Sequence, residues 1–249
     1  MTALPDGSHD VKVDAATLAV EGATVSAVHA RPVGPALGGV VVVPDIYGLR
    51  PLFEDICRGL ATHGLAVCAV EIFSRLAQSS SDSGAPGPLD IDARMARAGE
   101  LHDDVVMEEL AEAADHLAAT DGVSGISVMG FCLGGSYAFK AAATGRFERA
   151  VAFYGMVRTP AQWVGGGQRD ALGGVGSACP TLAIFGEVDP WVPADDVDGL
   201  RQAWVGRPEH KIVVYPGADH AFVHDPDRPA HRPDDAADAW RRALAFLLR

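Results

Sequence analysis

The chain has 249 residues, 48% of them hydrophobic, which is enough apolar material to bury the core of one domain. Its formal net charge of −13 opposes binding to nucleic acid and to anionic membrane surfaces. No stretch approaches the roughly 20 consecutive apolar residues of a transmembrane helix, and no basic and apolar leader opens the chain. We therefore expect a single domain over residues 1–249, located in the cytoplasm and acting on a small molecule.

Cysteine usage favours the same compartment. The four cysteines form no Cys-x-x-Cys pair and are too few for a disulfide framework, which is typical of free thiols in a reducing environment. Cys57 lies in a predicted helix and Cys68 in an apolar strand, so we expect both to be inert packing residues.

The first half of the chain predicts an edge hairpin followed by buried strands. Residues 12–20 and 24–30 alternate apolar and polar side chains around a Glu-Gly turn signal, so they predict an antiparallel hairpin. Residues 39–43, GVVVV, are typical of a strand covered on both faces. The next predicted segments are a loop (44–48), a helix (52–63), a strand (65–70), a surface loop (74–90) and a long helix (101–119). The loop over 74–90 is interpreted either as a border of the functional site or as a solvated linker.

Residues 126–143 combine a strand, a tight turn that reads GFCLG over 130–134, and a helix. A strand that turns at once into a helix crowds the residues beside the turn, so glycine is needed on both sides. This pattern indicates a nucleophile elbow, with Cys132 at the reactive position. At a helix N-terminus, backbone N–H groups and the helix dipole favour a thiolate. Cys132 is therefore predicted as a nucleophile rather than as an ordinary buried thiol.

The rest of the chain continues to alternate strands with helices or irregular segments. Strands are predicted over 150–154, 181–185 and 212–215, and helices over 195–204 and 234–248. The resulting order predicts an α/β fold of the α/β-hydrolase kind. We expect a mostly parallel sheet with helices on both faces and the antiparallel hairpin at its edge.

Two polar residues are candidates for the partners of Cys132. In an open α/β sheet the site lies beyond the carboxyl ends of the strands. Asp189 follows one late strand and His220 follows the last, in the order nucleophile, acid, base of α/β-hydrolases. His220 is predicted as the base that pairs with the thiol, and Asp189 as the residue that orients its ring. The competing candidates for the acid are Glu187, Asp195 and Asp196.

The oxyanion hole of this fold is made by main-chain donors. One N–H follows the nucleophile and the other comes from the loop after the third strand. These groups belong to Leu133 and Ile46.

Four motifs resemble those of the dienelactone hydrolases, or carboxymethylenebutenolidases. They are PDIYG, GFCLGG, GEVDPWVP and GADHAF, they occur in the family's order, and the likeness runs from about residue 40 to the end. The resemblance implies hydrolysis of a small ester or lactone through a thioester on Cys132, without a metal or cofactor. Members of this family cleave dienelactone to maleylacetate. The oligomeric state stays open between a monomer and a small homo-oligomer.

Two departures from the family pattern bear on the substrate. Members commonly have a glutamate, implied to activate the thiol, where this chain has Asp45, which is one methylene shorter. The best-known members hold the dienelactone carboxylate with two arginines; His224 stands at one of these positions, and Arg94 is the match for the other. Histidine does not provide the permanent bidentate clamp of arginine, so general ester or lactone hydrolysis is expected more firmly than cleavage of dienelactone itself.

Two alternatives remain. The same residues would serve a carboxylesterase or thioesterase acting on neutral substrates. A noncatalytic scaffold that binds a small ligand is a different class, and it has no need to present Cys132, His220 and Asp189 together.

Overall fold

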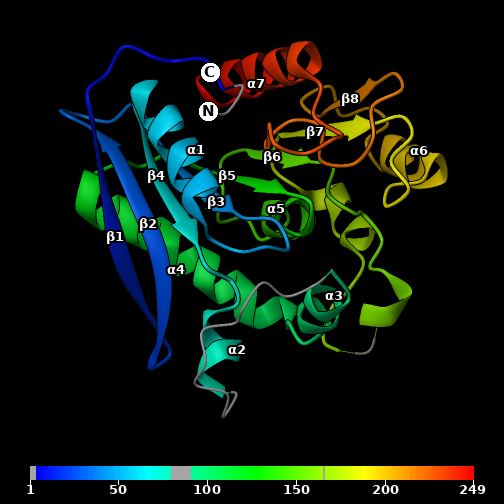
Figure 1. Ribbon diagram of the computed structural model, residues 1–249, viewed down its shortest axis with the longest axis horizontal. Coiled ribbons are helices and arrows are strands. Elements are labelled where there is room, and N and C mark those ends of the chain that lie inside the picture. Colours follow the sequence, from blue (N-terminus) through cyan, green and yellow to red (C-terminus); the bar gives the residue numbers. More distant parts are fainter. Residues whose placement is uncertain (1–3, 80–90, 165) are drawn as a thin grey trace.

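The computed structural model describes residues 4–79, 91–164 and 166–249 of the chain, and its architecture is shown in Figure 1. Within these ranges, one sheet contains eight strands in the order β1-β2-β4-β3-β5-β6-β7-β8. β1 pairs antiparallel with β2, and β2 pairs antiparallel with β4, whereas every pair from β4 to β8 is parallel. The predicted α/β sheet and its antiparallel edge hairpin are therefore confirmed. The strands are β1 (Val11–Val20), β2 (Ala23–Pro32), β3 (Gly38–Val43), β4 (Leu65–Val70), β5 (Ile126–Phe131), β6 (Ala150–Phe153), β7 (Thr181–Gly186) and β8 (Lys211–Tyr215).

Helices cover both faces of this sheet because its central strands are apolar on both sides. Along β3, Val41 packs into the core beneath α4, α5 and α6, whereas Val40 and Val42 pack into the opposite core beneath α1 and α7. Figure 1 shows α1 and α7 on one side of the sheet and α4 on the other. The main helices are α1 (Pro51–Thr62), α4 (Asp103–Asp121), α5 (Leu133–Ala142), α6 (Ala194–Ala203) and α7 (Pro233–Leu247).

The segment after β4 differs from the expected surface loop. Residues 74–79, the beginning of that predicted loop, form the short helix α2 (Ser74–Ser79), and a further helix, α3 (Ile91–Gly99), follows. Residues 80–90 of the predicted loop lie outside the described residues. In the part of the chain that the structure describes, the helices are too short or too polar to cross a membrane.

Candidate active site

Cys132 occupies the turn between β5 and α5, in a backbone conformation that non-glycine residues rarely adopt. Its φ is 56° and its ψ is −117°, and such a conformation persists only where the surrounding structure imposes it. A Cβ on Gly130 would lie 1.9 Å from the carbonyl oxygen of Gly134, and a Cβ on Gly134 would lie 2.1 Å from that of Val43. Both glycines are therefore required by close backbone contacts, and the turn presents a half-buried thiol at the start of α5.

Asp189 and His220 come together from the loops that follow β7 and β8. The His220 Nδ1 lies 2.7 Å from Asp189 Oδ2. The other oxygen, Asp189 Oδ1, accepts a hydrogen bond from the Trp191 backbone N–H at 2.8 Å. Because the carboxylate is buried and held at both oxygens, it favours a proton on Nδ1 of His220.

The charge state of His220 is coupled to Cys132. Burial favours the neutral ring, but the negative charge of Cys132 and the hydrogen bonds with Asp189 and Cys132 outweigh burial. Together they raise the pKa of His220 to about 10. A thiolate beside an imidazolium is the reactive form of a cysteine nucleophile.

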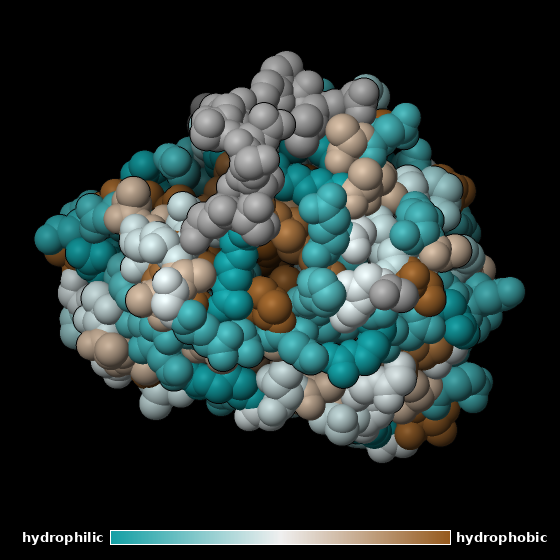
Figure 2. Space-filling model, turned by 90° about the horizontal axis from the view of Figure 1, so that it is seen from below, coloured by the Kyte–Doolittle hydropathy of each residue, from teal (hydrophilic) through white to brown (hydrophobic). Residues whose placement is uncertain are grey.

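Cys132 and His220 line a cavity of about 170 Å³, which we call the inner cavity. Its other walls are mainly apolar and come from the loop after β3, from α3 and from the segment after β6. Figure 2, seen from the side that carries α2 and α3, shows a hollow with hydrophobic residues at its base. The apolar lining residues include Ile46, Met95, Met156, Trp163 and Trp191.

The two residues expected to supply oxyanion donors are Leu133 and Ile46. Leu133 is the first residue of α5, directly after Cys132. Ile46 follows β3 and lines the inner cavity with the thiol. Both residues are almost fully buried, so their positions are set by packing and not by side-chain chemistry.

Asp45 is saturated by other partners. Oδ1 accepts hydrogen bonds from Arg50 Nη1 at 2.6 Å and from the Tyr47 N–H at 2.9 Å, while Oδ2 accepts from Arg50 Nη2 at 2.9 Å and from His224 Nε2 at 2.8 Å. Burial alone would raise the pKa of Asp45, but His224 and Arg50 lower it below its ordinary value. A carboxylate offers about four acceptor positions, and all four are used here. The expectation that Asp45 activates the thiol is therefore not supported by its hydrogen bonding.

His224 lies in the core and not at a substrate surface. The side chain is fully buried, its Nε2 bonds to Asp45 and its Nδ1 accepts the hydroxyl of Tyr154. Burial, more than the neighbouring charges, lowers the pKa of His224 and favours the neutral ring. Its ring stacks on Phe131 with a centroid separation of 5.0 Å. Both nitrogens are engaged, so the predicted role of His224 in holding a substrate carboxylate does not fit this placement.

Three guanidinium groups instead surround the ring of Tyr47 at the edge of the inner cavity. The guanidinium carbons of Arg94, Arg50 and Arg228 lie 4.4, 5.4 and 5.7 Å from the ring centroid. Arg94, which was predicted to bind substrate, therefore lies near the inner cavity but is not one of its lining residues. Arg228 does line the cavity, and sequence reasoning missed it. The signal available was its place in the loop between the last strand and the last helix, eight residues after His220.

Within the described residues, no cluster of three or more His, Cys, Asp or Glu side chains is arranged to hold a metal ion.

The mostly parallel sheet, the strained turn between β5 and α5, and the acid and histidine after β7 and β8 define an α/β-hydrolase. The dienelactone hydrolase family matches residues 25–249. The chain therefore belongs to that family, and it is a hydrolase of carboxylic ester or lactone bonds.

Individual relatives agree with this membership. A protein of Escherichia coli O157:H7 named "Putative carboxymethylenebutenolidase" is 30% identical over 233 residues, covering 91% of this chain and 83% of the relative. The "Carboxymethylenebutenolidase" of Rhodococcus opacus is 28% identical over 222 residues, covering 84% and 80%. Among solved structures, a "Putative Dienelactone Hydrolase" from Klebsiella pneumoniae subsp. pneumoniae MGH 78578 superposes with a TM-score of 0.86 at 28% identity, covering 96% of this chain and 99% of that one.

Proposed function

We propose that the protein hydrolyses a small carboxylic ester or lactone with Cys132 as nucleophile, His220 as acid and base, and Asp189 as the residue that orients His220. The observation that carries the proposal is the 2.7 Å contact between His220 Nδ1 and Asp189 Oδ2, which directs the remaining ring nitrogen to the thiol. Two further observations support it: Leu133 directly follows Cys132 at the start of α5, and Ile46 lines the inner cavity with the thiol.

In the acylation step, the Cys132 thiolate attacks the carbonyl carbon, and an electron pair moves onto the carbonyl oxygen. The N–H groups of Leu133 and Ile46 stabilise this oxyanion. When the oxyanion collapses, the bond from carbon to the alcohol oxygen breaks, and the His220 imidazolium gives its Nε2 proton to the leaving oxygen. The acyl group remains as a thioester on Cys132, and for a lactone the alcohol stays attached to it.

In the deacylation step, neutral His220 takes a proton from water as the water attacks the thioester. The bond from carbon to Sγ then breaks, the carboxylic acid product leaves, and the sulfur returns to the thiolate paired with the His220 imidazolium. Asp189 stabilises the imidazolium in both steps without itself taking the proton.

The lining of the inner cavity supports a compact, largely apolar acyl group beside a cationic edge. Ile46, Met95 and Met156 provide apolar contacts, whereas the arginines around Tyr47 provide positive charge. In a chain with a net charge of −13, this edge favours a substrate that carries a carboxylate, and dienelactone has this chemistry. The same catalytic residues would also hydrolyse neutral esters.

Trapping the thioester tests the mechanism directly. The wild-type protein, mixed with p-nitrophenyl acetate and quenched in acid within milliseconds, should gain one acetyl group on the peptide that contains Cys132. Cys132→Ala should gain none and should lose turnover, whereas Cys179→Ala, which removes the other half-buried thiol, should behave as wild type. Acetylation elsewhere with full turnover in Cys132→Ala would rule out the mechanism.

Steady-state rates with dienelactone and p-nitrophenyl acetate test the substrate class. The kcat/KM for dienelactone is divided by that for p-nitrophenyl acetate. A quotient larger than the same quotient of the uncatalysed hydrolysis rates supports recognition of the carboxylate. Turnover of the neutral ester alone would retain the catalytic residues and reject the anionic substrate. If neither compound is hydrolysed and Cys132 is not acylated, the protein is interpreted as a noncatalytic scaffold that binds a small ligand.

A further inference from the structure

A larger cavity adjoins the inner one, and we call it the outer cavity. Its volume is about 590 Å³, against about 170 Å³ for the inner cavity. The two cavities share Trp191, His220 and Arg228 as lining residues. Sites for small organic ligands typically measure about 300–1,000 Å³. The outer cavity therefore has room for a part of a substrate that the inner cavity cannot hold.

The position of His220 indicates which part this is. Cys132 lines the inner cavity and is not among the residues described as lining the outer one, so the acyl group bonded to its sulfur lies in the inner cavity. The leaving oxygen must lie within hydrogen-bond reach of the His220 ring that protonates it. Since His220 borders both cavities, an alcohol group too large for the inner cavity extends past His220 into the outer one.

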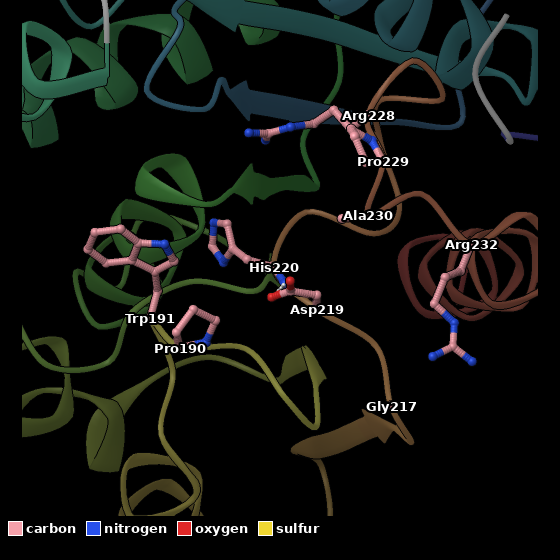
Figure 3. Close-up of a pocket in the computed structure, with 9 residues that line it drawn as sticks. All are labelled: Pro190, Trp191, Gly217, Asp219, His220, Arg228, Pro229, Ala230 and Arg232. Carbon is pink, nitrogen blue, oxygen red and sulfur yellow. Dashed lines mark hydrogen bonds between the residues drawn. The ribbon is translucent and has the colours of Figure 1, made fainter.

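Arg228 supplies a cation at this border. Its guanidinium forms no hydrogen bond or ion pair with any described residue. The guanidinium carbon lies 5.7 Å from the centroid of the Tyr47 ring. Arg232, which also lines the outer cavity, donates to the Pro216 carbonyl and pairs with Asp235. Figure 3 shows the Arg228 side chain extending toward the side on which the His220 and Trp191 rings lie, whereas Arg232 points away from them. Of the two arginines that line the outer cavity, Arg228 is therefore the one whose charge is not paired with a described residue.

We propose that the outer cavity is a leaving-group subsite, in which Arg228 binds an acidic group on the alcohol portion of an ester larger than the inner cavity holds. The proposal rests on the proposed function, because the orientation of the ester follows from Cys132 and His220. It assigns a substrate class: esters of a hydroxy acid, whose hydroxyl oxygen is the leaving atom and whose carboxylate contacts Arg228.

Three esters that share one acyl group separate this role from catalysis. 4-Acetoxybenzoate carries a carboxylate on its leaving group, 4-acetoxybenzamide is its neutral counterpart of similar shape, and phenyl acetate has the bare ring. All three form the same acetyl thioester, and the ratio of variant to wild-type kcat/KM removes their different intrinsic reactivities. Phenyl hydrogen succinate, with its carboxylate on the acyl side, completes the set.

Arg228→Gln should lower kcat/KM for 4-acetoxybenzoate about 10- to 100-fold, which is the usual effect of losing a hydrogen bond between charged groups. The benzamide, phenyl acetate and the succinate ester should change little. Arg201→Gln, which removes the same charge from the exposed surface of α6, should affect none of them. An equal loss for the benzoate and the benzamide, or no loss for either, would overturn the role of Arg228. A loss confined to the succinate ester would place Arg228 on the acyl side and overturn it as well.

A second variant tests the outer cavity itself. Ala230, an outer-cavity residue, is replaced in Ala230→Trp by a side chain that fills the space. This variant should lower kcat/KM for both substituted phenyl esters and spare methyl acetate, whose alcohol does not reach the outer cavity. Unchanged rates for the substituted esters would overturn the subsite. Preserved turnover of methyl acetate shows that the variant is folded, and failure of the proposed function is recognised separately by the absence of an acetyl group on Cys132.

Discussion

His224 and Asp45 are 179 residues apart in the sequence, yet His224 Nε2 lies 2.8 Å from Asp45 Oδ2. This hydrogen bond joins the loop after β8, which carries His220, to the loop after β3, which carries the proposed oxyanion donor Ile46. Both partners are essentially excluded from solvent. The pair thus fixes two segments of the active site to each other, and its role is positioning.

Replacing His224 should therefore lower the stability of the fold without changing which substrate is preferred. His224→Phe keeps the ring stacked on Phe131 but removes a hydrogen bond from Asp45 and from Tyr154. Leaving a buried polar group without its hydrogen-bond partner costs about 1–3 kcal/mol, so the free energy of unfolding in urea should fall by at least that amount. At temperatures where the variant is folded, the ratio of kcat/KM for dienelactone and for a neutral lactone should match that of wild type. A change in that ratio would indicate that His224 contributes to substrate binding.

His210 provides a matched control. It is also a buried histidine, and it stacks on Trp204. Neither ring nitrogen forms a hydrogen bond with a described residue, and Nε2 lies 3.7 Å from Glu209 Oε1. His210→Phe should therefore be neutral or stabilising, because an unsatisfied polar group is replaced by an apolar ring of similar shape.

The pH dependence of the two proposed steps, acylation and deacylation, should differ. In the free enzyme, the Cys132 thiolate helps to raise the pKa of His220 to about 10. The imidazolium form that protonates the leaving group is therefore lost only as pH rises through about 10, and kcat/KM should fall there. Acylation removes the charge of the thiolate, so the pKa of His220 is lower in the thioester. The deacylation rate, measured by stopped flow, should accordingly rise through a lower pKa as His220 becomes a neutral base. A fall of kcat/KM near pH 7 would contradict this coupling.

Asp189→Asn should lower kcat by about 100- to 10,000-fold with little change in the melting temperature, since an amide in place of the carboxylate favours the wrong tautomer of His220. The control is Asp219→Asn, which changes the neighbouring exposed aspartate whose Oδ1 accepts the backbone N–H of His220. That variant should retain nearly all activity, because its carboxylate does not contact the ring nitrogens. Equal losses in the two variants would remove Asp189 from its orienting role.

Glu109 should limit stability at alkaline pH. The side chain is buried in α4, and its oxygens form no hydrogen bond with a described residue, although Oε1 lies 3.3 Å from Arg75 Nε. Burial outweighs the charge of Arg75 and raises the pKa of Glu109 to about 8. The folded chain keeps the proton, whereas the unfolded chain releases it near pH 4.3. The stability associated with the neutral form is therefore complete below about pH 4 and is lost as pH rises through about 8. Glu109→Gln should melt at a higher temperature than wild type at pH 9, with a smaller difference at pH 5. Glu108→Gln, at the more exposed neighbouring position, should show no such trend.

The parts of this protein that follow from local patterns could be read from the sequence. The apolar runs of β3 and β5, the glycines around Cys132, and the placement of Asp189 and His220 after late strands depend on residues close together in the chain. The parallel sheet then brings the carboxyl ends of its strands to one edge. For this reason the fold and the meeting of the three predicted catalytic residues needed no knowledge of particular side-chain contacts.

What only the tertiary structure decided was how the remaining charged residues are partnered. The sequence places Asp45, His224 and Arg228 in loops at the catalytic edge, where each is equally able to meet a substrate. In the folded chain, Asp45 is saturated by Arg50 and His224, His224 is enclosed by aromatic rings, and Arg228 forms no ion pair with the residues that the structure describes. The physical reason is that burial requires a polar group to find partners, and those partners come from segments far apart in the sequence. A sequence pattern states which groups reach the site; packing decides which of them remain available to bind a substrate.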